Sequence, residues 1–175
     1  MISCSSHLRR RCAMQLKIGD RAPEFRAAAV GGKYGAGKEA KLSDLRGTRV
    51  VLYFYPKDNT PGCTTQACGL RGAWEELRNH AQIFGVSIDS TASHQKFIDK
   101  FRLPFPLLSD PERKIVNAYG VWVEKSFLGK KYMGTERTTF VIDSEGHIEK
   151  IFRKVKPKEH IDLLRQFTNG DDSTE

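Results

Sequence analysis

Three continuous apolar segments of strand length place the strongest limits on how this chain can fold. They are Val50–Tyr55, Ile83–Ile88 and Thr138–Ile142. Apolar runs this short are typical of strands that are buried on both faces of a sheet. Because helices must then cover those faces, the segments predict an α/β domain with a mixed central sheet flanked by helices.

The segments between these strands predict helices and two hairpins. Apolar spacings of three and four residues, with N-cap and proline signals, predict helices over about 64–79, after Ser90, from Asp110 to about Gly120, and from Pro157 to about Phe167. Phe25–Val30 followed by the glycine-rich connection Gly31–Gly37 predicts an N-terminal hairpin, and the turn Asp143–Gly146 predicts another before residues 147–152. This order fits a thioredoxin-like fold and, in outline, a flavodoxin-like one.

The distribution of charge disfavours a nucleic-acid-binding module. The chain of 175 residues has a formal net charge of +8, and residues 1–19 contain four basic residues and no acidic one. The rest of the chain holds 25 basic and 21 acidic residues, which are interspersed. No basic stripe alternates with aromatic residues, as in proteins that bind single strands. No apolar run approaches the roughly 18–20 residues of a membrane span.

The ends of the chain and its cysteines suggest a reducing compartment. Four cysteines, at positions 4, 12, 63 and 68, are too few for a disulfide-stapled secreted domain of this length. The N-terminus lacks the apolar region of a signal peptide, so we expect a cytoplasmic protein. The basic residues 1–13 leave an organelle presequence open, as they leave open a start at Met14.

The predicted domain organisation has three parts. We expect residues 1–15 to form a flexible extension, residues 16–168 to form one thioredoxin-like domain, and residues 169–175 to form a flexible acidic tail. The length is consistent with a single domain.

The segment Pro56–Cys68 carries the most specific chemical signal. It follows the buried strand Val50–Tyr55 and leads into a predicted helix, and open α/β sheets place ligands in crevices at such strand ends. Cys63 falls at or near the first helical turn. The unpaired N–H groups and the positive dipole end of a helix stabilise an anion there. Because the thiolate is the nucleophilic form of cysteine, Cys63 is suited to be a reactive thiol.

Cys68 follows Cys63 by five residues, and spacing alone leaves its role open. In an intact helix the two positions differ by about 7.5 Å in rise and about 140° in direction, so a disulfide between them requires the helix to unwind. Gly69 and Gly72 would ease that unwinding by about 1 kcal/mol each relative to Ala. An inert loop thiol at Cys63 and an inert core thiol at Cys68 are the alternative.

The histidines do not complete a metal site with these cysteines. Zinc needs four ligands, and two cysteines without a second pair of Cys or His are too few. The histidines at positions 80, 94, 147 and 160 fall in unrelated elements, and we expect them to be surface or capping residues.

Three motifs make the chain resemble the peroxiredoxins, and most closely their peroxiredoxin Q branch, also called bacterioferritin comigratory protein. The family motif Pro-x3-Thr-x2-Cys is met by Pro56, Thr60 and Cys63. Gly129–Gly134 together with Arg137–Asp143, and the stretch Gly19–Phe25, also match this branch. The resemblance covers roughly residues 16–167.

The resemblance implies a role for each of five residues. Cys63 would be the peroxidatic cysteine, which attacks a peroxide oxygen and becomes a sulfenic acid, and Cys68 would be the resolving cysteine, which closes an intramolecular disulfide. Thr60 would hydrogen-bond the sulfur and the peroxide, Arg137 would hold the thiolate and polarise the O–O bond, and Pro56 would shield the thiolate from water. A turn-capping Thr60 and a surface Arg137 on an edge strand are the alternatives.

The resemblance also implies an activity and partners. The chain would be a thiol-dependent peroxidase for hydrogen peroxide and organic hydroperoxides, recycled by thioredoxin or a related dithiol protein. It would be a monomer or weak dimer that needs no metal, haem or flavin and binds neither nucleic acid nor membrane. The alternative functions are a protein disulfide oxidoreductase, which would call for a Cys-x-x-Cys pair that is absent, and a non-enzymatic holdase or basic binding module.

Overall fold

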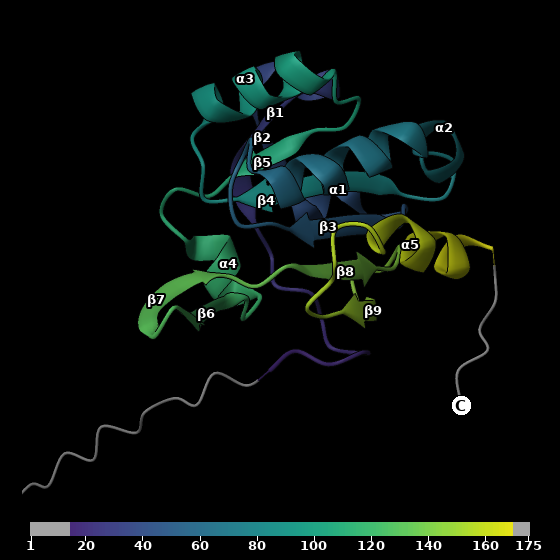
Figure 1. Cartoon of the computed structure of the whole chain (residues 1–175). Helices are drawn as coiled ribbons and strands as arrows, with labels where there is room; N and C mark the ends of the chain where they lie inside the picture. Colours follow the sequence, from purple (N-terminus) through teal and green to yellow (C-terminus); the bar gives the residue numbers. More distant parts are fainter. Residues whose placement is uncertain (1–14, 170–175) are drawn as a thin grey trace, which may run out of the picture.

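A seven-stranded mixed sheet forms the centre of the computed structural model, which describes residues 15–169 (Figure 1). The strand order across the sheet is β2-β1-β5-β4-β3-β8-β9. The strands are β1 (Arg26–Val30), β2 (Ala36–Lys41), β3 (Val50–Phe54), β4 (Gln82–Ser87), β5 (Leu107–Ser109), β8 (Thr138–Ile142) and β9 (Ile148–Phe152). The predicted terminal segments 1–15 and 169–175 fall almost wholly outside the described residues, so their boundaries stay predictions.

The centre of the sheet is parallel and its two sides are antiparallel. Strands β3, β4 and β5 pair in parallel, whereas β8 pairs antiparallel with β3 and β9 antiparallel with β8. On the other side, β1 pairs antiparallel with β5 and with β2. The mixed α/β sheet, its N-terminal hairpin and the β8–β9 hairpin are therefore confirmed.

Helices cover both faces of the sheet, but unequally. The helices are α1 (Pro61–Gly72), α2 (Trp74–Leu77), α3 (Thr91–Phe101), α4 (Lys114–Ala118) and α5 (His160–Thr168), with short 3-10 helices at Gly32–Tyr34 and Leu42–Leu45. Figure 1 shows α1, α2, α3 and α5 over the same side of the sheet, with α4 apart from them beside the β6–β7 hairpin.

The alternation of side chains along β3 explains how one strand serves two cores. Val51 and Tyr53 belong to the apolar cluster that includes residues of α1, α3 and α5, whereas Leu52 and Phe54 belong to the cluster that includes residues of α4. Successive strand residues point to opposite faces, and every residue of β3 is buried. The continuous apolar run in the sequence is thus a strand buried on both faces.

Three predicted helices have different limits in the structure. The helix predicted over 64–79 begins earlier, at Pro61, and is divided at Ala73 into α1 and α2. The helix predicted from Asp110 begins only at Lys114, because the Asp110 carboxylate lies ahead of the helix and accepts N–H groups of its first turn. The last helix begins at His160 instead of Pro157.

The sequence interpretation missed β5 and a separate two-stranded hairpin, β6 (Trp122–Phe127) with β7 (Lys130–Thr135). β5 has only three residues and follows Pro104 and Pro106 closely, so it lacks a recognisable period. Most residues of β6 and β7 are exposed or half-buried, and charged residues interrupt their apolar pattern. Within residues 15–169, no helix has both the length and the apolar character to cross a membrane.

We predict that Gly85→Ala destabilises the fold. A Cβ atom on this β4 residue would lie 2.6 Å from Leu107 Cδ2 and 2.8 Å from the Tyr53 hydroxyl oxygen, inside a packed core. Overpacking of this kind costs about 1–3 kcal/mol, which urea unfolding would measure.

Gly72→Ala is the matched control, because a Cβ atom there would meet nothing within 4 Å. Ala is the better helix former by about 1 kcal/mol, so this variant should be as stable as the parent or more stable. Equal stability of the two variants would contradict the prediction.

Candidate active site

Cys63 lies in the first turn of α1, as the sequence predicted. The helix begins at Pro61 with Thr60 as its N-cap residue, and Cys63 is only 2% exposed. Proline suits this position because its missing N–H would have no partner there. The free N–H groups of the first turn and the helix dipole stabilise negative charge on the sulfur.

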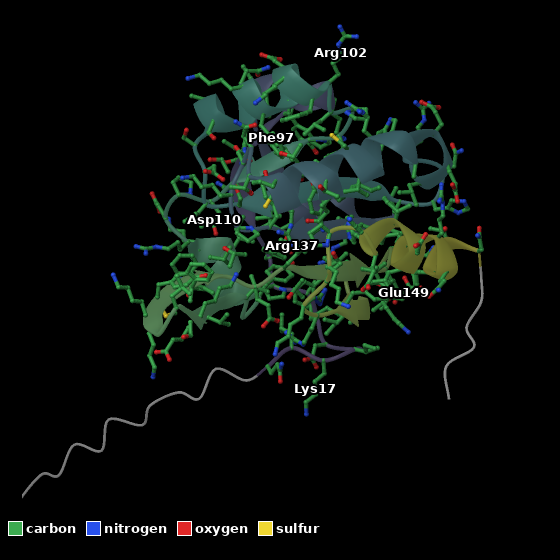
Figure 2. The ribbon with its side chains drawn as sticks, viewed as in Figure 1. Lys17, Phe97, Arg102, Asp110, Arg137 and Glu149 are labelled. Atoms are coloured by element: carbon green, nitrogen blue, oxygen red, sulfur yellow. The ribbon has the colours of Figure 1, made fainter. Side chains whose placement is uncertain are left out.

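Arg137 reaches Cys63 from the far end of the sequence. Its Nη2 donates to Cys63 Sγ at 3.5 Å. Strand β8 pairs antiparallel with β3 so that Thr138 faces Phe54. The residue just before β8 therefore emerges at the edge where β3 runs into the Cys63 loop, and Figure 2 shows Arg137 between the ribbons of α1 and β8.

The surroundings of Arg137 exclude the alternative in which Arg137 is a surface residue on an edge strand. β8 lies between β3 and β9, inside the sheet. The backbone carbonyl of Arg137 accepts the N–H of Val155 at 2.8 Å. A Cβ atom on Gly62 would lie 3.2 Å from Arg137 Nη2, so a glycine beside Cys63 leaves room for the guanidinium.

A buried chain of polar side chains holds the other side of the guanidinium. Arg137 Nη1 donates to Gln66 Oε1 at 2.5 Å, which leaves the Gln66 amide nitrogen facing His160 Nδ1 at 3.0 Å. His160 Nε2 in turn lies 2.9 Å from the Thr139 hydroxyl. Burial, and then the charge of Arg137, lower the pKa of His160 to about 3. His160 is therefore a neutral ring that accepts at Nδ1 and donates from Nε2.

The sequence interpretation missed this chain. It placed His160 at the surface or in a cap, which is wrong, because His160 and Gln66 are both 0% exposed. His94, placed in the same group, is also fully buried. Gln66 had a signal in the sequence, since a residue three positions after Cys63 shares its helix face. His160 had none, because its partners come from α1 and β8.

Two further ionisable groups near the site have shifted pKa values. Burial, followed by the charge of Cys63, raises the pKa of Tyr53 well above its ordinary value, so Tyr53 stays a neutral phenol. Its hydroxyl is buried without a partner among the described residues. Burial, followed by Arg137, lowers the pKa of Lys125, which donates to the Thr135 carbonyl.

The loop between β3 and α1 presents the other predicted site residues. Pro56 and Thr60 are half-buried. The Thr60 hydroxyl donates to the Lys57 carbonyl at 2.9 Å. Among the hydrogen bonds of residues 15–169 none joins Thr60 to Cys63, but the hydroxyl oxygen keeps its lone pairs for an acceptor role.

Cys68 lies on the same helix as Cys63, and both are free thiols. Five residues of intact helix separate them, or about 7.5 Å of rise, so a bond between them needs local unwinding. Gly69, the residue after Cys68, has a packing role that the sequence did not reveal, because a Cβ atom there would lie 3.1 Å from Ile161 Cγ1 of α5. Within the described part of the chain, no cluster of three His, Cys, Asp or Glu side chains is arranged to hold a metal ion.

Comparison with known proteins gives a consistent family assignment. Residues 18–151 match the model of the AhpC/TSA family. Peroxiredoxin Bcp of Bacillus subtilis is 49% identical over 149 residues, which are 85% of this chain and 92% of that protein. The putative peroxiredoxin bcp of Coxiella burnetii is 46% identical over 149 residues, 85% of this chain and 95% of that protein.

Solved structures agree with this assignment. A cysteine-to-serine mutant of Xylella fastidiosa PrxQ superposes with a TM-score of 0.81 at 30% identity, over 90% of this chain and 99% of that one. The bacterioferritin comigratory protein of Xanthomonas campestris, described for its alkyl peroxide reduction activity, gives a TM-score of 0.76 at 34% identity, over 84% of this chain and 91% of that one. The fold is therefore thioredoxin-like, and the flavodoxin-like alternative is excluded.

The shifted pKa of His160 predicts a pH-dependent stability. Because the folded-state pKa is about 3, the unfolded chain binds more protons in acid than the folded protein does. The contribution is present near neutral pH and is lost as the pH falls below the unfolded value of about 6.5. Between about pH 7 and about pH 5, this one group should lower the free energy of unfolding by about 2 kcal/mol.

Urea unfolding of the parent and of His160→Gln at both pH values would measure this contribution. The variant cannot titrate at this position, so its stability should fall less over the same interval, even if it is lower at neutral pH. An identical pH slope in both proteins would show that His160 is not a buried neutral ring.

Proposed function

Because the chain belongs to the AhpC/TSA family, and within it to the Bcp/PrxQ peroxiredoxins, we propose that it is a thiol peroxidase that reduces hydroperoxides with Cys63. The observation that supports this most directly is the Arg137 Nη2 atom, which lies 3.5 Å from the Cys63 sulfur at the start of α1. A cationic donor and a helix N-terminus there stabilise the thiolate that the reaction needs.

The peroxide step transfers one oxygen to sulfur. The Cys63 thiolate attacks the terminal oxygen of the hydroperoxide, an S–O bond forms, and the O–O bond breaks. Cys63 becomes a sulfenic acid, and the departing alkoxide or hydroxide takes up a proton to give an alcohol or water. Arg137 faces the sulfur with donors in a fixed fork, so it can stabilise the charge that develops on the oxygens.

Thr60 and Pro56 complete the proposed peroxide pocket. The Thr60 hydroxyl proton is engaged by the Lys57 carbonyl, so its oxygen is available to accept a hydrogen bond from the terminal O–H of the peroxide. Pro56 offers no N–H, and in this proposal it shields the thiolate from water.

Cys68 closes the cycle in this proposal. Its sulfur attacks the sulfur of the Cys63 sulfenic acid, a disulfide forms and water leaves. The step requires the first turns of α1 to unwind, because both cysteines lie on one continuous helix. Thioredoxin or a related dithiol protein then returns both thiols. The Bcp relatives are peroxiredoxins, and X. campestris Bcp is described for alkyl peroxide reduction, which favours organic hydroperoxides beside hydrogen peroxide as substrates.

The setting of the reaction is part of the proposal. A reducing compartment such as the cytoplasm suits a cycle that returns two thiols. For the oligomeric state, the prediction remains a monomer or a weak dimer.

Thiol counting tests the cysteine roles. In a background with Cys4→Ser and Cys12→Ser, only Cys63 and Cys68 can react. One equivalent of hydrogen peroxide should then consume two thiols and leave a Cys63–Cys68 linkage that peptide mass spectrometry maps. When Cys68→Ser is added to this background, Cys63 should still react with peroxide at the parent rate. The product should be a sulfenic acid at Cys63, and thioredoxin should not support turnover.

Adding Cys63→Ser to the same background should abolish peroxide reduction. Retained turnover in this variant would refute the assignment. Disulfide reduction of insulin without peroxide would instead favour a protein disulfide oxidoreductase.

Arg137→Gln should slow the reaction of Cys63 with peroxide. Removing one preorganised donor from a developing oxyanion costs about 10²–10³ in rate. Stopped-flow kinetics of the reduced protein would measure it, because this step precedes the action of Cys68 and of any reductant.

Arg165→Gln is the matched control for Arg137→Gln. Arg165 is an exposed arginine of α5 that pairs with Glu76, so this variant should react at the parent rate. A rate for Arg137→Gln within twofold to threefold of the parent would contradict the assigned role.

A further inference from the structure

The loop that carries Pro56 and Thr60 is anchored at one buried carboxylate. Asp58, midway between these two residues, is 7% exposed. Its backbone N–H donates to Asp89 Oδ2 at 2.9 Å, and Asp89 follows β4. An ionisable group this deeply buried is stable only when its polar atoms are paired.

Three side chains converge on the two oxygens of Asp58. The Tyr55 hydroxyl donates to Oδ1 at 2.6 Å, and the Ser93 hydroxyl donates to Oδ2 at 2.8 Å. His94 Nδ1 lies 2.7 Å from the same Oδ2. Burial, and then the charge of Asp58, raise the pKa of Tyr55 well above its ordinary value, so Tyr55 stays a donor. Each oxygen of the Asp58 carboxyl group therefore has at least one side-chain partner.

Both ring nitrogens of His94 face acceptors. Nε2 lies 3.0 Å from the Leu108 carbonyl oxygen of β5, while Nδ1 faces Asp58. A backbone carbonyl and a carboxylate can only accept, and a neutral imidazole has only one N–H. The ring is 0% exposed, so no water can replace either partner. His94 therefore needs a proton on each nitrogen to satisfy both contacts.

We propose that Asp58 and His94 form a buried carboxylate–imidazolium pair that positions the 56–60 loop over Cys63 for the peroxide step. The inference rests on the proposed function, since it concerns the rate at which Cys63 reacts. Neither residue touches the sulfur in this arrangement; both act through the loop and are positioning residues.

The loop needs such an external restraint. Asn59 has a φ of 58°, in the left-handed region, a conformation that costs free energy in most residues but that Asn tolerates better than others. The Thr60 hydroxyl donates to the Lys57 carbonyl, and Asp58 lies between these two residues in the chain. A shift of Asp58 would therefore move both Lys57 and Thr60. A misplacement of about 1 Å at a reacting centre can cost about 10²-fold in rate.

Other charged groups nearby do not replace the pair. Asp89 accepts the Asp58 backbone N–H and the Ser87 hydroxyl, so it adds negative charge on the β4 side. Lys100 of α3 donates to the Asn59 side chain at the exposed edge of the loop. Among the described contacts of the Asp58 carboxylate, His94 is the one side chain that can carry a positive charge.

The first test observes the proton directly. Nitrogen NMR of the reduced full chain, labelled in its histidines and assigned with His94→Gln, should show His94 protonated on both ring nitrogens at neutral pH. A neutral His94 ring with one unprotonated nitrogen would overturn the pair.

The second test separates positioning from stability. Asp58→Asn and His94→Leu should each lower the second-order rate constant of Cys63 with hydrogen peroxide by about 10–100-fold, measured by stopped flow on protein shown to be folded. His94→Gln keeps one side-chain donor and should recover part of the rate lost in His94→Leu. Combining Asp58→Asn with His94→Leu should cost less than the product of the two single effects, because the residues act as a unit.

Lys96→Ala, an exposed change in the same helix, is the control and should react at the parent rate. Variants that lose stability but keep the parent rate constant would show a merely structural pair and refute the proposal. That outcome leaves the peroxidase assignment intact, whereas peroxide reduction by Cys63→Ser would refute the assignment itself.

Discussion

The hydrogen bond from Arg137 to the Cys63 sulfur is the interaction on which the rest of the site depends. It joins residues 74 positions apart at 3.5 Å, and three features of the fold make it possible. The antiparallel pairing of β8 with β3 brings Arg137 to the edge where β3 ends. The early start of α1 places Cys63 in its first turn. Gly62 leaves the guanidinium its space. A guanidinium and a thiolate that share a water-poor site stabilise each other, because each charge offsets the desolvation of the other.

Sequence reasoning found the parts of this arrangement that have a local cause. The buried strands and the place of Cys63 at a helix start follow from neighbouring residues, whereas the Pro56–Thr60–Cys63 motif was recognised through the family resemblance. What it missed comes from contacts between distant elements. His160 looked like a surface residue because its partners Gln66 and Thr139 lie on α1 and β8. The late start of α4 depends on the Asp110 carboxylate, and the short β5 exists because β4 and β1 flank it.

Two buried polar networks lie in the elements that carry the candidate site, and they differ in kind. The chain through Gln66 and His160 contains a neutral ring and holds a charged donor, Arg137. The group around Asp58 holds the backbone of a loop. Fully satisfied polar networks in a low-dielectric interior restrict side chains to one arrangement. The site can therefore keep its donors aimed before a peroxide arrives, which is the condition for electrostatic catalysis.

Gln66 lies between Cys63 and Cys68 on α1. In the proposed cycle this position favours the reduced form, in which the helix is intact. In the proposed cycle the helix would have to unwind for the two sulfurs to meet, and this would draw Gln66 away from Arg137 and His160. His160 is fully buried and Arg137 is half-buried, and a buried polar group that loses its partner costs about 1–3 kcal/mol. The oxidised form would thus store part of the free energy of the disulfide as unsatisfied polar groups. Reduction would release this free energy by letting the helix re-form, so in this cycle the reductant would need to supply only two electrons and two protons.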